Sequence, residues 1–252
     1  MHIKGPFNIQ YLLKGDDLYV IECNLRASRS IPFVSKTGNI NLIELATEVM
    51  LGKTLENAEI PSISHFGVKV PQFPFVKLEG ADPILGVEMV STGEVACLGD
   101  SFSDALLKSL IASQLKIPSE SSSVLISVSD KFRPRILEIA RRLRQMGFRI
   151  YATPRTSAFL LENGIVARAL NYEDKGLNIS DYLVNRKIDL VITTPIEDDY
   201  TESECNYWIT RKAIDFNIPT ILNMELAEAL TEAIEQRRKV PFQMKSWNEY
   251  FA

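Results

Sequence analysis

Residues 124–152 read VLISVSDKFRPRILEIARRLRQMGFRIYA, a stretch in which a strand, a helix and a second strand follow one another closely. The apolar run 124–128 predicts a short strand. A helix is expected over 134–146, because proline suits the first helical turn and Gly147 follows the last one. The apolar run 148–152 predicts the next strand. Units of this kind form parallel sheets, since the helix carries the chain back to the edge where the first strand began.

The same alternation continues from this unit to the C-terminus. Further strands are expected over 166–170, 190–194 and 220–222. Further helices are expected over 157–163, 180–186, 207–216 and 224–238. Short apolar strands between amphipathic helices are typical of a sheet that is covered on both faces. We therefore predict an open parallel α/β sheet for this half of the chain.

Upstream of this sheet, the Ser-Glu-Ser-Ser-Ser run is the clearest linker signal in the chain. Before it, strands are expected over 7–13, 18–23 and 91–98, helices over 41–51 and 101–114, and an irregular or extended segment over 66–75. The sequence thus predicts a first domain over 1–118, a linker over 119–123 and a second domain over 124–252.

Composition narrows the possible partners and compartments. Of 252 residues, 46% are hydrophobic and 24% are charged, as in ordinary globular proteins. A net charge of −4 gives no signature of nucleic-acid or membrane partners, and no apolar run is long enough for a membrane span. Cys23, Cys97 and Cys205 lack metal-ligand spacing, so we expect buried thiols in a reducing compartment. The cytoplasm is expected, with the mitochondrion as the alternative.

A second run, VIECNLRASR at residues 20–29, carries the chemistry. Glu22 and Asn24 lie two residues apart at the end of the expected strand, so their side chains point to the same face. Magnesium takes a few oxygen ligands from a protein and more from phosphates, and arginines hold phosphate oxygens in a fork. Two oxygen donors followed by Arg26 and Arg29 therefore predict a magnesium-phosphate site. The alternative is that Glu22 caps the hairpin and the arginines lie on a solvated face.

The turn between the first two strands decides whether Gln10 joins this site. A three-residue loop over 15–17 would pair Lys14 with Leu18 and would place Gln10 opposite Glu22 on one face. A two-residue loop would shift the register and remove this pairing. The sequence allows both loops. We favour the three-residue loop because it gathers the oxygen donors in one patch.

The N-terminal half resembles the large subunit of carbamoyl-phosphate synthase in the stretches GPFNIQ, VIECNLRASRSIPFVSK, DPILGVEM and STGEVACLG. They fall in the family's order and look like the end of the second ATP-grasp module, which phosphorylates carbamate. Residues from about 124 onward look like the family's regulatory domain, of methylglyoxal-synthase-like fold. The resemblance implies a partial ATP-grasp α+β module followed by an open parallel α/β domain, from the last part of a longer polypeptide.

The resemblance also implies roles for the oxygen-rich patch. Family residues that hold divalent metals on the ATP phosphates match Gln10, Glu22 and Asn24. Two family arginines that contact phosphate or the carbamate end match Arg26 and Arg29. The implied cofactors are ATP with Mg2+ or Mn2+, and K+ is a further candidate. The side chains would neutralise charge during in-line phosphoryl transfer.

Two allosteric sites are implied as well. Glu94, in STGEV, matches a glutamate that binds an amino-acid activator in bacterial members; a glutamate on an exposed strand edge is the alternative. In open α/β sheets, ligands bind beyond the C-terminal ends of strands, near helix N-termini. Thr153 and Thr156 follow one expected strand, and Thr193 and Thr194 end another. These groups would hold a phosphate or carboxylate, unless the first two only cap the next helix.

The family's effector pocket supports this placement through the spacing of Thr153 and Thr156. Ser127 and Arg133 match pocket positions of the bacterial type, in which a lysine replaces the arginine and the effectors are nucleotides.

Other positions point to the urea-cycle type, which binds N-acetylglutamate. Tyr172 stands where that type has an aromatic residue, and Asn206 matches one of its asparagines. However, Thr193 and Ile196 stand where it has two other asparagines. The effector, a nucleotide or N-acetylglutamate, is therefore left open.

We expect a segment of a carbamoyl-phosphate synthase, which makes carbamoyl phosphate from bicarbonate, an amino nitrogen from ammonia or glutamine, and two ATP. It would act on ATP and carbamate with the remainder of the synthase and a glutaminase subunit or domain, for pyrimidine or for arginine and urea synthesis. Lacking the upstream glycine-rich loop and nucleotide-binding lysines, the chain alone is expected to be inactive. Its first residues read like a start within a domain, and its last like the end of a stand-alone synthase. The alternatives are an effector-binding regulatory protein without catalysis and another ATP-grasp ligase.

Overall fold

The computed structural model describes residues 3–55, 61–73, 75, 81–84, 90–119, 121–172, 177–194 and 200–251, with the side chains of 200–204 left aside. Contacts within the chain divide it into two compact units. The first comprises residues 1–67 with 244–252, and the second comprises residues 68–243. Each unit is described by itself.

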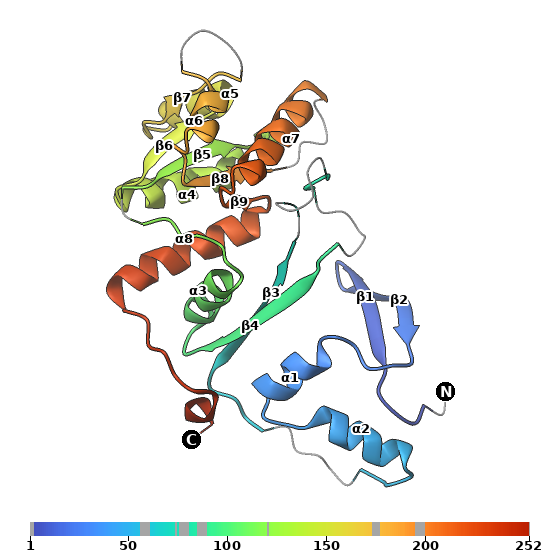
Figure 1. Cartoon of the computed structure of the whole chain (residues 1–252). Helices are drawn as coiled ribbons and strands as arrows, with labels where there is room; N and C mark the ends of the chain where they lie inside the picture. Colours follow the sequence, from blue (N-terminus) through green and yellow to red (C-terminus); the bar gives the residue numbers. More distant parts are fainter. Residues whose placement is uncertain are drawn as a thin grey trace. The chain divides into compact units, whose positions relative to one another are not determined.

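The first unit contains a β-hairpin followed by two helices (Figure 1). The hairpin consists of the antiparallel strands β1 (Asn8–Lys14) and β2 (Asp17–Asn24). The helices are α1 (Ile31–Thr37) and α2 (Leu42–Met50). Helix α2 begins where the Asn41 side chain accepts a hydrogen bond from the Glu44 N–H at 3.1 Å. The last residues of the chain add a short 3-10 helix, η3 (Trp247–Tyr250).

His65 lies in the interior of this first unit. It is buried, and its Nε2 lies 2.9 Å from the carbonyl oxygen of Thr37. Its ring contacts the rings of Tyr250 and Phe251, with centroids 5.5 and 4.8 Å away. These contacts give His65 a structural role and tie the C-terminal residues into the unit.

The second unit contains a five-stranded sheet in the order β7-β6-β5-β8-β9, in which every neighbouring pair is parallel. The strands are β5 (Ser123–Ser127), β6 (Arg149–Ala152), β7 (Arg168–Ala169), β8 (Leu190–Thr193) and β9 (Thr220–Ile221). The helices are η2 (Asp130–Phe132), α4 (Arg133–Gln145), α5 (Pro154–Glu162), α6 (Ile179–Val184), α7 (Tyr200–Asp215) and α8 (Met224–Lys239).

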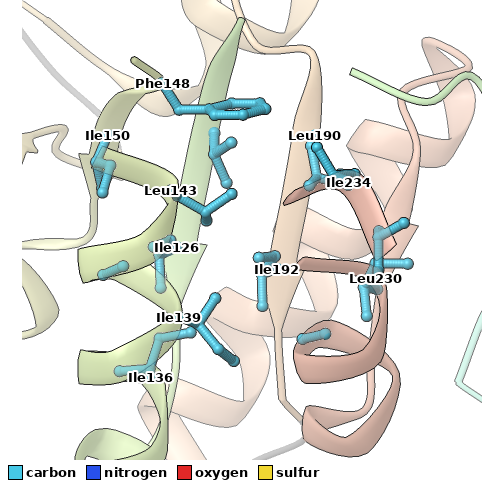
Figure 2. Packing of buried hydrophobic residues seen from close by; sticks show 14 of the residues in the cluster. Ile126, Ile136, Ile139, Leu143, Phe148, Ile150, Leu190, Ile192, Leu230 and Ile234 are labelled. Carbon is cyan, nitrogen blue, oxygen red and sulfur yellow. The ribbon is translucent and has the colours of Figure 1, made fainter. Parts of the chain in front are cut away.

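The two faces of this sheet carry separate hydrophobic cores. Val124 and Ile126 of β5 belong to a cluster with α4 and α8, whereas Leu125, between them, belongs to a cluster with α6 and α7. Figure 2 shows the first cluster, in which Leu143 of α4 and Leu230 of α8 approach the same face of the strands. Because both faces are covered, the central strands β5 and β8 carry continuous apolar runs.

A smaller sheet packs within the same unit. Strand β3 (Phe66–Gln72) pairs with β4 (Gly93–Gly99), and α3 (Phe102–Ala112) packs on β4. The buried Ser109 hydroxyl of α3 donates to the Val68 carbonyl at 2.7 Å and accepts from the Cys97 N–H at 3.2 Å. One side chain therefore ties the helix to both strands. Leucines of α3 also enter the core cluster shared by α4 and α8.

Arg135 links helix α4 to helix α8. Its guanidinium donates to Glu225 at 2.6 Å and to both carboxylate oxygens of Glu228 at 2.8 Å. These hydrogen bonds lower the pKa of the Glu225 and Glu228 carboxyls and raise the pKa of Arg135.

The predicted fold class is confirmed, since an open parallel α/β sheet follows an α+β arrangement. Helix α7 begins at Tyr200 rather than at 207, and α5 begins at Pro154 rather than at 157, because proline again occupies the first turn. Helix α1 was not expected from the sequence. Residues 66–72 form a regular strand despite Pro71, which is tolerated because both strands of a two-stranded sheet are edges.

Two further expectations concern the cysteines and the domain boundary. Cys23 is exposed, and Cys97 and Cys205 are partly exposed, so the expectation of buried thiols was wrong. The predicted linker falls inside the second compact unit, because α3 shares its core with α4 and α8. Compact units are defined by contacts alone, and the division into domains stays a prediction. Within the described residues, no helix has the length and apolar character needed to cross a membrane.

Leu160 and Leu161, neighbours on α5, provide a matched test of the core. Leu160 is fully buried and Leu161 is 63% exposed. We expect Leu160→Ala to lower the free energy of unfolding by about 2–5 kcal/mol, because it leaves a cavity. Leu161→Ala should change it by less than about 0.5 kcal/mol. Urea unfolding followed by circular dichroism measures both, and equal effects would contradict this description of the core.

The Arg135 contacts predict how stability depends on pH. A carboxyl whose pKa is lowered in the folded state stabilises that state above its unfolded pKa, and this contribution is lost as pH falls through the folded pKa. The thermal midpoint of the wild type should therefore fall more steeply below about pH 4.5 than that of Arg135→Gln. Arg141→Gln, which removes an ion pair within α4, is the control and should keep the wild-type slope. Identical slopes for all three proteins would rule out the linkage.

Candidate metal and effector sites

The hairpin of the first unit brings three oxygen-bearing side chains together. Gln10 on β1 lies directly opposite Glu22 on β2, and Asn24 is two residues further along the same strand. The Asn24 side-chain amide donates to Glu22 Oε1 at 2.9 Å. Gln10 and Glu22 are exposed, so the patch is open to a ligand from solvent.

The loop that produces this register differs from the predicted loop. Lys14 pairs with Asp17, so the loop has two residues, Gly15 and Asp16, and the three-residue loop was wrong. Gly15 has a φ of 61°, which glycine adopts without strain. The ladder then shifts between Gln10 and Tyr11.

Ile21 is the extra residue that causes this shift. Tyr11 pairs with Val20 and Gln10 pairs with Glu22, so Ile21 has no partner across the ladder. Such a β-bulge adds one residue to one strand. It therefore restores the pairing that a two-residue loop alone would have removed, and the expectation that this loop excludes the pairing was also wrong.

The donor set fits a metal that is shared with phosphates. It offers one carboxylate and two amide side chains, and within the described part of the chain no three His, Cys, Asp or Glu side chains cluster as a metal site. Magnesium is commonly held by one or two carboxylates plus substrate phosphates, so a single carboxylate is compatible with that ion. Arg26 and Arg29 follow β2 on the surface, and Arg26 Nη1 donates to the Ala27 carbonyl at 3.3 Å.

The second site lies in the other unit, at the C-terminal ends of the parallel strands. Ser127 ends β5, Thr153 follows β6, and Thr193 ends β8 with Thr194 directly after it. All four side chains are buried. Because parallel strands end at the same edge of a sheet, the topology brings these hydroxyls together.

Asn206 of α7 connects two of these strand ends. Ser127 Oγ donates to Asn206 Oδ1 at 2.5 Å, and Asn206 Nδ2 donates to the Thr194 carbonyl at 3.0 Å. The Asn206 side chain is 3% exposed. A buried amide that makes both kinds of hydrogen bond fixes the helix relative to the strands.

Thr153 and Thr156 extend this network to α5. Thr153 Oγ1 donates to Thr156 Oγ1 at 3.1 Å, and Thr156 Oγ1 lies 3.5 Å from both the N–H and the carbonyl oxygen of Val128. Thr153 occupies the N-cap position but makes no side-chain capping bond. Its hydroxyl therefore does not cap the helix, and its part in effector binding stays a prediction. The hydroxyl instead lies 3.4 Å from Ser127 Oγ at the end of β5.

Among the remaining predicted effector residues, Arg133 begins α4 and Tyr172 follows β7. Arg133 pairs with Asp130 at 2.7 Å, and its Cζ lies 5.9 Å from the centre of the Phe159 ring. The Arg133 Nε and the Thr193 hydroxyl are buried without a hydrogen-bond partner among the described residues. Tyr172 packs partly buried against the core cluster of α6 and α7. Ile196 lies outside the described residues.

Glu94 on β4 forms an ion pair with Lys69 on β3, at 3.0 Å. Both side chains are about one-quarter exposed, at 26% and 23%. The pairing of Lys69 with Glu94 was not expected from the sequence. The position of Lys69 on the neighbouring strand could not be read from spacing, because the pairing of β3 with β4 spans a long connection.

A separate cavity of about 210 Å³ lies at the opposite end of the parallel strands, where the strands begin. Its walls include Lys116, Ser122, Asp189 and Asn217, which precede strands or lie at their N-terminal ends. The Asp189 carboxylate accepts the Ser123 N–H at 2.7 Å and so supports the start of β5. The hydrogen-bonded side chains of Ser127, Thr153, Thr156 and Asn206 are called the strand-end network. The cavity is distinct from this network, and none of the predicted site residues lines it.

Two family models match separate parts of the chain. The model described as Carbamoyl-phosphate synthase L chain, ATP binding domain, matches residues 1–58. The model described as MGS-like domain matches residues 135–222. Gln10, Glu22 and Asn24 thus fall in the first match, and most of the strand-end network falls in the second.

Curated relatives extend the similarity over nearly the whole chain. The mitochondrial carbamoyl-phosphate synthase [ammonia] of Homo sapiens is 40% identical over 94% of this chain and 16% of that protein. Multifunctional protein pyr1-3 of Dictyostelium discoideum is 39% identical over 98% of this chain and 11% of that protein. Multifunctional protein URA2 of Saccharomyces cerevisiae is 40% identical over 94% of this chain and 11% of that protein.

The chain is therefore similar along almost all of its length to carbamoyl-phosphate synthases, which confirms the family resemblance predicted from the sequence. It spans about one-sixth or less of the length of these relatives (16% and 11%). Among solved structures, methylglyoxal synthase from Elizabethkingia anophelis NUHP1 aligns with a TM-score of 0.35 at 12% identity, covering 52% of this chain and 90% of that one. A score this low adds no argument.

Asn206 predicts a measurable contribution of the network to stability. Asn206→Ala leaves the buried Ser127 hydroxyl and the Thr194 carbonyl without this partner, so we expect a loss of about 1–3 kcal/mol of unfolding free energy. Asn163→Ala is the control, since Asn163 is exposed and its side-chain amide donates to the Phe159 carbonyl of its own helix. Denaturant unfolding of the two variants compares them. A loss no larger than that of the control would show that the network does not contribute to the free energy of unfolding.

Proposed function

We propose that the chain contributes part of the carbamate-phosphorylating site and the effector domain of a carbamoyl-phosphate synthase. The family resemblance over nearly the whole chain supports this function. The single structural observation that carries it is the pairing of Gln10 with Glu22, with Asn24 hydrogen-bonded beside them. Three oxygen donors on one exposed face suit a cation that also binds ATP phosphates.

In this proposal the hairpin residues hold Mg2+ or Mn2+, which would supply charge neutralisation for phosphoryl transfer when ATP is bound. Arg26 and Arg29, directly after β2, contact phosphate or carbamate oxygens, because guanidinium groups bind such oxygens in pairs. The remaining substrates and partners are those of the whole synthase, including its other segments and a glutaminase domain or subunit. The chain by itself does not make carbamoyl phosphate. We place it in the cytoplasm, with the mitochondrion as the alternative.

The strand-end network is the proposed effector site. Ser127, Thr153, Thr156 and Asn206 form one buried set of hydroxyl and amide groups at the start of α5. Arg133 and Thr193 add a buried donor and a buried hydroxyl that no described residue satisfies. Such groups suit a phosphate or carboxylate, so the effector is a nucleotide or N-acetylglutamate. Thr194 and Tyr172 complete the proposed site, and Glu94 is proposed for an amino-acid activator.

A manganese titration tests the metal site. In 15N-labelled chain, Mn2+ should broaden the amide signals around Gln10 and Asn24 most strongly, because the ion relaxes nearby nuclei. Glu22→Gln removes the only carboxylate of the patch and should abolish this selective broadening. Asp16→Asn, which removes a carboxylate from the tip of the same hairpin, should leave it intact. Equal broadening in all three proteins would reject the site.

Calorimetric titration with UMP, UTP and N-acetylglutamate tests the effector site and separates the two effector classes. We expect one of these ligands to bind, and the double change Thr153→Ala, Thr156→Ala to weaken it at least tenfold, because two hydroxyls that face the ligand are lost. Thr47→Ala, an exposed threonine on α2, is the control and should bind like the wild type. Unchanged affinity in the double variant would overturn the placement of the pocket.

A further inference from the structure

Arg211 of α7 holds a distant segment of the chain. Its Nη1 donates to the Ala81 carbonyl at 2.7 Å, and its Nη2 donates to the Phe75 carbonyl at 3.2 Å. Its side chain is 13% exposed and is also paired with Asp215, one turn along the same helix. The two carbonyls belong to the connection between β3 and β4. Ala81 and Arg211 are separated by 130 positions in the sequence.

Contacts within the segment and within α7 hold the two partners of these hydrogen bonds in place. Phe75 is buried and its ring stacks on that of Phe73, with centroids 5.5 Å apart. A planar guanidinium presents several donors in a fixed fork, so it can bind two carbonyls at once. Asp215 fixes the orientation of that fork by accepting from Arg211 Nε at 3.0 Å. Arg211 is therefore held in one position relative to its own helix while it binds the segment.

The same helix carries Asn206, the centre of the strand-end network. Five residues of an α-helix span about 7.5 Å, so the two side chains lie little more than one turn apart along α7. Asn206 reaches Ser127 and the Thr194 carbonyl on one side. Arg211 reaches the Phe75 and Ala81 carbonyls on another. No flexible joint lies between them, because residues 206 to 211 are all within the helix.

From these contacts we infer that Arg211 is a positioning residue that couples the strand-end network to the β3–β4 connection through α7. A change at Asn206 shifts or rotates the helix, and Arg211 passes that movement to the two carbonyls. As a regulatory route this rests on the proposed function, since it gives the effector pocket a way to influence the segment that precedes Glu94. The mechanical link itself requires no effector.

Hydrogen exchange of the 252-residue chain tests the link without any ligand. Exchange is followed by mass spectrometry in peptides that contain Ala81. Arg211→Gln should speed exchange there roughly tenfold, because two hydrogen bonds to a charged donor are lost. Arg211→Lys keeps the charge and one donor direction, and should give an intermediate rate. Arg141→Gln, on the surface of α4, is the control and should exchange like the wild type.

The coupling is measured by a double-mutant cycle. Ser127→Ala releases Asn206 without changing α7 and should speed exchange at Ala81 about threefold in the wild type, but not in Arg211→Gln. Asn206→Ala should behave in the same way, and peptides of β5 and α8 report whether either variant unfolds. If Ser127→Ala has no effect on the Ala81 peptides, or the same effect with and without Arg211, the inference is wrong. Because no effector is added, a failed calorimetric titration would leave this result intact.

Discussion

The second unit depends on one constraint, the burial of strand β5 on both faces. Val124 and Ile126 pack into one core and Leu125 packs into the other, so β5 must lie between two helical layers. Its neighbours on both sides run parallel to it. Parallel strands then end together, and their polar terminal residues meet at the C-terminal ends of the strands. Ser127, Thr153 and Thr194 are close to one another for this reason.

In the first unit the position of Glu22 depends on a compensation between a turn and a bulge. The two-residue loop at Gly15 favours a tight hairpin. Without the extra residue Ile21, that loop would place Glu22 out of line with Gln10. The bulge therefore brings Glu22 opposite Gln10, and bulges that redirect a side chain in this way are common near active sites. Two irregularities that cancel each other thus produce this pairing.

The sequence predicted the parallel sheet because the apolar runs and the Pro and Gly signals at helix ends agreed with one another. It also predicted that Gln10 would face Glu22, although through the wrong loop. Bulges leave no mark in the pattern of residue types, so Ile21 could not be identified in advance. Lys69 and Arg211 escaped notice for another reason. Their partners, Glu94 and the Phe75 and Ala81 carbonyls, are brought near only by long-range packing.

We propose that the second unit binds an anionic effector at the C-terminal strand ends and nowhere else. Chemical-shift mapping of backbone amides during titration with UMP and, separately, with N-acetylglutamate locates the bound ligand. One of these ligands should shift the amides of Thr153, Thr156 and Asn206 most. Shifts centred on Lys116 and Asn217, at the cavity where the parallel strands begin, would contradict this proposal, as would the absence of shifts with either ligand.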